Sequence, residues 1–223
     1  MAPCTKNIID FKNIKFGYDD NIIFDNLNFT IQMGCRYILV GQNGVGKTTL
    51  FKLAYNSIKP QEGYVIKDDR LRIGYYHQQM VDNLPLDLTP IEYLQSIDST
   101  LDLTQCRCIL GKLGIKKKDI MDLPTSIIST LSGGEKARVS LASIQMFSPQ
   151  LILMDEPTNH LDLESINGLI KGINDFNGAL VIITHDMYLI KSIKDATIYE
   201  TKNKDIEKFK GSFEKYCDSI LVE

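Results

Sequence analysis

The residues with the clearest chemical meaning form a glycine-rich segment, Gly41 to Thr48, with the sequence GQNGVGKT. Glycine permits backbone conformations that other residues resist, so successive N–H groups in such a loop can turn toward one anion. Lys47 adds a mobile cation for phosphate oxygens, and the Thr48 hydroxyl can ligate Mg²⁺. A helix that starts at Lys47 adds the positive end of its dipole. The segment therefore predicts a site for the phosphates of a nucleotide.

An acidic pair follows an apolar run further along the chain. Leu151–Met154 leads directly into Asp155 and Glu156. In open α/β folds, ligands bind where the carboxyl ends of the parallel strands meet. Asp155 would suit a Mg²⁺ shell there, and Glu156 could polarise a water for attack on a terminal phosphate. Such a strand end is weak evidence by itself, but together with the glycine-rich segment it indicates nucleotide hydrolysis.

Two more segments could contact phosphate. A serine and two glycines precede an expected helix in Leu131–Glu135, which could form a second anion cradle or a plain N-cap. His185 follows an apolar run and could reach a γ-phosphate or the attacking water, although a lone histidine is more often structural. One nucleotide has a single γ-phosphate. Two helix N-termini therefore imply two ligands, or one site built from halves of different domains.

The elements that must position these residues alternate along the chain. Apolar runs with no polar alternation predict strands buried on both faces, and they lie at 36–40, 151–155 and 179–184. Helical patterns lie between or beside them, at 47–57, 135–147 and 162–173. Strands that alternate with helices predict an α/β core with a mainly parallel sheet.

Segments outside this core show other patterns. Antiparallel strands are expected at 8–16 and 27–31, and as a pair at 63–67 and 71–76. The stretch from about 89 to 129 has few strand signals, but Ile91–Ile97 and Cys106–Leu113 show roughly helical spacing, which predicts a small helical insert. After Glu200 we expect a hairpin around 202–205 and a short helix from Ser212.

Composition limits the function classes. The 223 residues include 25 Lys and Arg and 28 Asp and Glu, so the net charge of −3 argues against a surface devoted wholly to nucleic acid or membrane. Lys116–Lys118 is a compact basic run, which indicates a solvated face more often than an RNA contact. No apolar run approaches the roughly 20 residues of a membrane-spanning helix.

The cysteines and the N-terminus point to the cytoplasm. The five cysteines are odd in number and scattered, which favours reduced thiols. Cys106 and Cys108 have no further Cys or His near them in the sequence, so a metal site there is not expected. The first residues form no hydrophobic signal core, and we expect a cytoplasmic location.

In order along the chain, these motifs resemble an ATP-binding cassette (ABC) domain over nearly the whole length. The order is the glycine-rich segment, the glutamine of Tyr75–Gln78, the signature Leu131–Glu135, the acidic pair and His185. The resemblance implies a P-loop nucleotide hydrolase core of mainly parallel sheet with an antiparallel β edge and a small helical insert. It implies one ABC domain over 1–223. Its parts would be a catalytic core at about 1–79 and 135–200, a helical subdomain at about 80–134, and a hairpin and helix at about 201–223.

The same resemblance implies ATP and Mg²⁺ as cofactors and a second cassette as partner, from the same parent chain or from a homodimer. Two cassettes pack head to tail in this family, and the signature of one closes over the ATP of the other. This arrangement corresponds to the second solution above, one site built from two halves.

Within the family, Glu156–Asp162 resembles the ABC-F subfamily, because it carries Asn159 and His160 where transport cassettes usually have Ser-Ala. Arg72–Gln78 and Phe209–Tyr216 resemble the second cassette of eukaryotic ABC-F proteins. Those proteins are soluble, carry two cassettes, and act on ribosomes or in ribosome assembly. We therefore expect a piece of a longer chain that meets ribosomes or rRNA through its parent. The alternatives are the nucleotide-binding domain of a membrane transporter and an ATP-dependent clamp.

The resemblance also assigns a role to each matching residue. Tyr18 would stack on adenine, Glu156 would be the catalytic carboxylate, and His185 would sense the γ-phosphate. Asp162 would pass signals between two sites. The catalytic set is Lys47, Gln78, Glu156 and His185, and the Mg²⁺ ligands are Thr48, Gln78 and Asp155. The other ATP contacts are Gly41, Gln42, Asn43, Gly44, Val45, Gly46, Lys47, Thr48 and Thr49. The residues facing the partner's ATP are Leu131, Ser132, Gly133, Gly134 and Glu135.

Overall fold

The computed structural model describes residues 6–118, 121–159, 161–211 and 215–216, with backbone only at 78–79, 117–118 and 121. The chain divides into two compact units. The first comprises 1–73, 150–156 and 177–223, and the second comprises 74–149 and 157–176. Among the described residues, each unit has its own set of buried apolar side chains.

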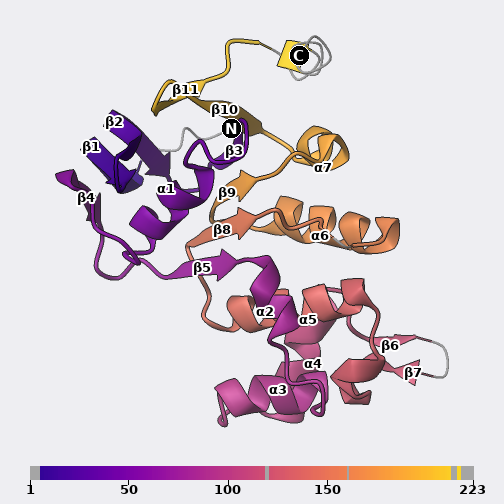
Figure 1. Ribbon diagram of the computed structural model, residues 1–223. Coiled ribbons are helices and arrows are strands. Elements are labelled where there is room, and N and C mark those ends of the chain that lie inside the picture. Colours follow the sequence, from indigo (N-terminus) through magenta and orange to yellow (C-terminus); the bar gives the residue numbers. More distant parts are fainter. Residues whose placement is uncertain (1–5, 119–120, 160, 212–214, 217–223) are drawn as a thin grey trace. The chain divides into compact units, whose positions relative to one another are not determined.

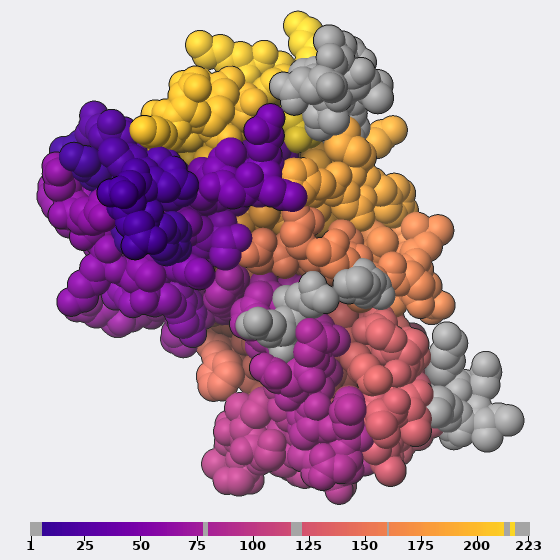
Figure 2. All heavy atoms as spheres, viewed as in Figure 1, coloured from indigo at the N-terminus to yellow at the C-terminus, as the bar shows by residue number. Residues whose placement is uncertain are grey.

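A three-stranded antiparallel sheet opens the first unit. Its order is β2-β1-β4, with bounds β1 (Asn7–Tyr18), β2 (Asn21–Gln32) and β4 (Glu62–Lys67). Phe11, Phe24 and Leu27 are fully buried on its inner face. These N-terminal strands, indigo to purple, lie together at one side of the first unit (Figures 1 and 2). The strands expected at 8–16 and 27–31 are confirmed and are longer than expected.

The second sheet of this unit holds the strands that the apolar runs predicted. In the first unit its order is β11-β10-β3-β9-β8, and all neighbours are parallel except β11 with β10. Every residue of β9 is buried, as is most of β3 and β8. The bounds are β3 (Arg36–Val40), β8 (Leu151–Asp155), β9 (Ala179–Ile183), β10 (Ala196–Lys202) and β11 (Asp205–Lys208).

The hairpin expected around 202–205 is confirmed. β10 and β11 are antiparallel, and Lys202 pairs with Asp205 across a two-residue turn. Asn203 and Lys204 have φ angles of 51° and 64°, the left-handed conformations that a tight hairpin turn of this length requires. Of the terminal helix expected from Ser212, only Lys215 and Tyr216 are described, and both are helical. The remainder of that prediction lies outside the described residues.

Besides the helical Lys215 and Tyr216, the described part of the first unit contains two short helices. α1 (Lys47–Ala54) follows β3 and buries Leu50, Phe51 and Leu53. α7 (Met187–Ser192) follows β9, and the Asp186 carboxylate accepts the N–H groups of Tyr188 and Leu189 at its start. Both helices therefore begin just after the carboxyl end of a buried strand.

The second unit is mainly helical and is organised around α5 (Gly133–Met146). This helix contacts α2, α3, α4 and α6, and most of its side chains between Ala137 and Ile144 are buried. The other helices are α2 (Gln78–Asp82), α3 (Pro90–Ile97), α4 (Leu103–Lys112) and α6 (Leu163–Asp175), with short 3-10 turns at Leu123–Thr125 and Ile128–Thr130. The strands are β5 (Ile73–Tyr76), which begins at the unit boundary, β6 (Lys117–Lys118) and β7 (Met121–Asp122).

The architecture is α/β with a mostly parallel sheet, an antiparallel sheet and a helical part, as the sequence predicted. One strand pairing that the sequence predicted was wrong. The segments at 63–67 and 71–76 do not form a hairpin, because β4 pairs with β1 and β5 is not in that sheet. The second unit takes in α5 and α6 as well as the stretch 80–134, because those helices pack against each other and α5 packs on α3 and α4. The expected domain organisation stays a prediction.

Candidate functional site

The glycine-rich segment forms the loop between β3 and α1. Gly41, Gly44 and Gly46 have φ angles of 138°, 82° and 111°, which side chains disfavour. Gly46 is the N-cap of α1, and a Cβ there would overlap the side chain of Ile23. The loop can therefore fold back over the end of β3 only because these positions lack a side chain, and it leaves Gln42, Asn43 and Gly44 exposed.

Lys47 is buried at the base of this loop, with 7% of its surface exposed. Its ammonium donates hydrogen bonds to the carbonyl oxygens of Gly41 and Gln42, the latter at 2.8 Å. The Nζ atom also lies 3.4 Å from His185 Nε2. Burial lowers the pKa of Lys47, while Glu156 and Asp155 act to raise it. The lysine is thus a desolvated cation between the loop and two carboxylates.

The next residue of α1 faces the end of β8. Thr48 Oγ1 donates a hydrogen bond to Asp155 Oδ2 at 2.8 Å. Two hard oxygen donors, a hydroxyl and a carboxylate, therefore lie side by side although 107 residues separate them in the sequence. Such oxygens are the ligands that Mg²⁺ prefers.

Glu156 continues from Asp155 in an unusual backbone conformation. Its φ angle is 46°, which is uncommon for a residue other than glycine, and its N–H donates to Ile183 O at 2.9 Å. This turn brings Glu156 Oε1 within 3.7 Å of His185 Nε2. Burial raises the pKa of Glu156, and the charge and backbone N–H of His185 partly offset that effect.

The first unit also contains Tyr18, at the end of β1. Its side chain is 43% exposed, and its ring packs edge-on against Phe16 with 5.0 Å between centroids. A large part of this residue is therefore accessible to solvent, as a base-stacking role would need.

The remaining predicted residues belong to the second unit. Ser132 caps α5 and Asp162 caps α6, and both side chains accept an N–H of their own helix. Leu131 and Gly134 are buried, whereas Ser132 and Gly133 are exposed. Gln78 begins α2, but its side chain and all of His160 lie outside the described residues.

The structure thus gathers the predicted residues into two groups. The first unit brings Lys47, Thr48, Asp155, Glu156 and His185 together, and the second unit holds the signature and Asp162.

Sequence reasoning missed two buried polar residues near these groups. Thr184 is fully buried, and its hydroxyl accepts the Asp186 N–H at 3.0 Å before α7. Ser165 is 2% exposed in the first turn of α6. Thr184–Asp186 carries a readable signal, because Thr and Asp before an apolar run are typical of a helix start. Ser165 has no comparable signal, since only packing shows that it is buried.

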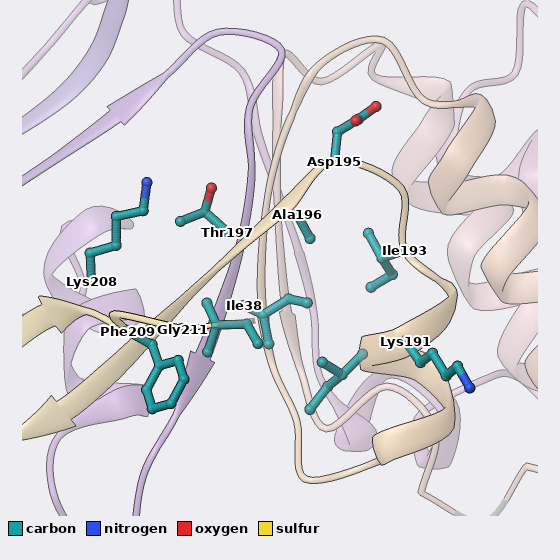
Figure 3. Close-up of a pocket in the computed structure, with 11 residues that line it drawn as sticks. Ile38, Lys191, Ile193, Asp195, Ala196, Thr197, Lys208, Phe209 and Gly211 are labelled. Atoms are coloured by element: carbon teal, nitrogen blue, oxygen red, sulfur yellow. The ribbon is translucent and has the colours of Figure 1, made fainter. Parts of the chain in front are cut away.

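A separate cavity of about 600 Å³ lies elsewhere in the first unit (Figure 3). Its walls come from β3, α7, β10 and the chain after β11, and Phe209 projects along one side of it. None of the predicted site residues lines this cavity. The cavity is therefore separate from the site that the motifs predict.

Comparison with known proteins identifies the family. A family model described as "ABC transporter" matches residues 24–159, more than half of the chain. The chain belongs to the ABC transporter family. The matched segment of this ABC domain runs from β2 through the loop and the signature to Asn159.

Curated relatives resemble the ABC domain over almost all of its length. It is 39% identical to ABC transporter F family member 4 of Dictyostelium discoideum over 98% of the chain and 19% of that relative. It is 37% identical to ATP-binding cassette sub-family F member 2 of Bos taurus over 99% of the chain and 35% of that relative. It is 34% identical to Protein GCN20 of Saccharomyces cerevisiae over 96% of the chain and 28% of that relative. The chain therefore spans well under half the length of these relatives.

A solved structure shares the fold. The structure of cbiO1 from Clostridium perfringens, part of the ABC transporter complex cbiONQ, superimposes with a TM-score of 0.78 at 21% identity, over 98% of this chain and 93% of that one. This likeness shows the fold, and the family match identifies the chain as an ATP hydrolase domain of the ABC type. In the part of the chain that the structure describes, no helix has the length and apolar character needed to cross a membrane.

The raised pKa of Glu156 gives a stability prediction. Because its folded pKa lies above the unfolded value, ionising this carboxyl costs the folded state free energy at neutral pH. Glu156→Gln removes that cost. The variant should melt higher than the wild type at about pH 7.5, by roughly 2 °C. The difference should vanish near pH 3, below the unfolded pKa, where the carboxyl is protonated in both states.

Calorimetric melting curves over this pH range test the prediction. Glu207→Gln, at an exposed position of β11, is the matched control and should show no such gain. A Glu156→Gln protein that melts at or below the wild-type temperature throughout would contradict the desolvation of this carboxyl.

Proposed function

We propose that this chain binds Mg-ATP at Gly41–Thr49 and hydrolyses it to ADP and phosphate with the groups at the ends of β3, β8 and β9. One observation carries the proposal. Five residues form one cluster through three contacts, Lys47 with His185, Thr48 with Asp155, and Glu156 with His185. A cation, a pair of oxygen ligands and a carboxylate beside an imidazole are the groups that phosphoryl transfer to water requires.

The donor set fits Mg²⁺. This ion usually takes one or two protein oxygens and completes its shell with water and phosphate. Thr48 and Asp155 supply those two oxygens, and from the family resemblance we propose Gln78 as a third ligand. When bound, the ion offsets the negative charge of the phosphates.

The chain's own residues have separate roles in the proposed reaction. The loop N–H groups and the start of α1 hold the phosphates, and Lys47 neutralises their outer oxygens. Burial makes Glu156 more basic than an exposed carboxylate, so it is suited to accept a proton from an attacking water. His185, 3.7 Å from Glu156, keeps that carboxylate oriented and meets the γ-phosphate. Most of the rate comes from positioning and charge neutralisation.

We further propose that a second cassette completes the site. The start of α5 offers N–H groups at Ser132–Glu135 with Ser132 and Gly133 exposed. The Ser132 hydroxyl accepts the Glu135 N–H at 3.3 Å, which leaves its hydrogen able to donate to a phosphate. Head-to-tail pairing would bring this cradle to the γ-phosphate of the partner's ATP, and Asp162 to the boundary between the two sites.

The wider role follows from resemblance. Asn159 and the F-family relatives support ABC-F membership, and from that we propose a cytoplasmic parent protein that acts in translation or ribosome biogenesis, in contact with ribosomal particles.

Lys47→Ala tests nucleotide binding. Loss of the buried ammonium should weaken Mg-ATP affinity at least about tenfold, because a charge-assisted contact to phosphate is removed. Titration calorimetry measures this directly. Glu156→Gln is the matched variant: it should keep ATP affinity and stall turnover. Undiminished affinity in Lys47→Ala would overturn the phosphate site, and wild-type turnover in Glu156→Gln would remove that residue from its role.

The composite site predicts a rate that depends on protein concentration. A lone chain lacks the partner's signature, and loss of such a donor set costs on the order of 10²–10³ in rate. Turnover per molecule at saturating Mg-ATP should therefore rise as the chain is concentrated and dimers form. Steady-state phosphate release across a hundredfold dilution series, with sedimentation velocity in parallel, checks this. A flat specific activity would contradict head-to-tail pairing.

Co-sedimentation tests the wider role. The parent protein should pellet with ribosomal particles in the presence of ATP, and a parent carrying Glu156→Gln should pellet more completely because turnover no longer releases it. Western analysis of sucrose-gradient fractions measures both. Association with membranes instead would favour a transporter subunit.

A further inference from the structure

The first turns of α5 and α6 lie in close contact within the second unit. Gly134 is buried in the first turn of α5, and Ser165 is 2% exposed in the first turn of α6. A Cβ placed on Gly134 would overlap both Oγ and Cβ of Ser165. The Ser165 side chain therefore occupies the space that any residue other than glycine at 134 would need.

Both helix starts carry residues with an expected role. The Ser132 hydroxyl and the Glu135 carboxylate cap α5 reciprocally, at 3.3 Å and 2.9 Å from the N–H groups they accept. Asp162 Oδ1 caps α6 by accepting the Ser165 N–H at 2.8 Å. Ser165 thus touches the signature turn with its side chain and the Asp162 side chain with its backbone.

The Asp162 side chain lies beside the same position. Its Oδ1 atom is 3.5 Å from the point where a Cβ on Gly134 would lie, so the cap of α6 is next to the signature turn. Three residues from two segments, 28 positions apart between Gly134 and Asp162, form one packed group within a single unit. A displacement of one turn would require a displacement of the other, because close-packed groups do not deform independently.

We propose that Ser165 is a positioning residue that holds the signature turn Ser132–Glu135 and the Asp162 turn as one rigid element. The proposal deepens the proposed function and rests on it for its consequence. A helix N-terminus stabilises an anion only when its N–H groups are aimed at it, and small misplacements are costly in rate. Ser165 holds the N–H groups of the signature turn in the direction of the phosphate. It also makes the Asp162 turn move together with the signature turn when the partner's nucleotide binds.

Amide hydrogen exchange on the chain without nucleotide tests the rigid element itself. Ser165→Gly removes the side chain that fills the space beside Gly134. Exchange should then rise by about tenfold in two peptides, one covering 131–137 and one covering 161–166. Ser129→Gly, at an exposed position before the signature, is the matched control and should leave the 161–166 peptide unchanged. Faster exchange in 161–166 alone, with 131–137 as in the wild type, would overturn the proposal.

A compensation experiment tests the consequence for catalysis. Gly134→Ala should lower the concentration-dependent turnover by about tenfold. Ser165→Gly alone should also lower turnover, because the signature turn loses the side chain that packs beside Gly134. In the Gly134→Ala/Ser165→Gly protein the methyl group fills the vacated space and should restore turnover to at least about threefold above either single variant. Gly134→Ala with Ser165→Ala should stay low, because Ser165 Cβ is one of the two overlapping atoms. Stoichiometric ATP binding, measured in parallel, should be unchanged in all variants.

The outcomes separate the two proposals. No recovery in the Gly134→Ala/Ser165→Gly protein would mean that the methyl group acts on the partner's phosphate, and would overturn the positioning role. If Gly134→Ala does not fold, recovery of soluble, ATP-binding protein by Ser165→Gly but not by Ser165→Ala supports the contact, and equal failure of both overturns it. A wild-type rate that is flat with concentration would refute pairing, and the exchange measurement would still decide the role of Ser165.

Discussion

The candidate site depends on one constraint, the placement of the buried Lys47 ammonium among groups from three neighbouring strands. Two loop carbonyls and His185 surround it, and Glu156 and Asp155 act on its charge. Strand register produces this arrangement, because Ile183 lies opposite both Leu39 and Asp155 in the parallel sheet. The segments after these three strands, which carry the loop, Glu156 and His185, must therefore emerge at one edge. A slip of two residues in any one strand would separate the cation from its partners.

In the second unit, packing between helices and not strand register orients the candidate residues. Its two exposed helix starts, at Ser132 and Asp162, carry no buried charge, so their orientation must come from packing. The absence of a side chain at Gly134 and the small side chain of Ser165 let the two helices meet at their first turns. The two units thus position the groups that we propose for phosphate binding in different ways: the first through register in a buried sheet, and the second through close contact between helix ends.

Much of the fold and of the candidate site could be predicted where the local sequence pattern was strong. Buried strands at β3, β8 and β9 follow from apolar runs, since a strand covered on both faces cannot alternate. The β4–β5 pairing was wrong because a short turn between two apolar segments favours a hairpin locally, whereas β4 gains a longer partner in β1. The short helices α2 and α7 and the β6–β7 pair were not expected, since segments of two to six residues carry too little periodicity to identify.

The sequence by itself determined which chemical groups are available and in which order they occur. The loop glycines, Lys47, the acidic pair, the signature and His185 are recognisable because each needs a particular residue type beside a particular kind of element. Only the tertiary structure decided which groups meet. The Thr48–Asp155 hydrogen bond spans 107 positions, and the burial of Ser165 against Gly134 has no counterpart in any local pattern. Distances between such residues are set by strand register and helix packing, which depend on the whole buried surface and not on neighbours in the chain.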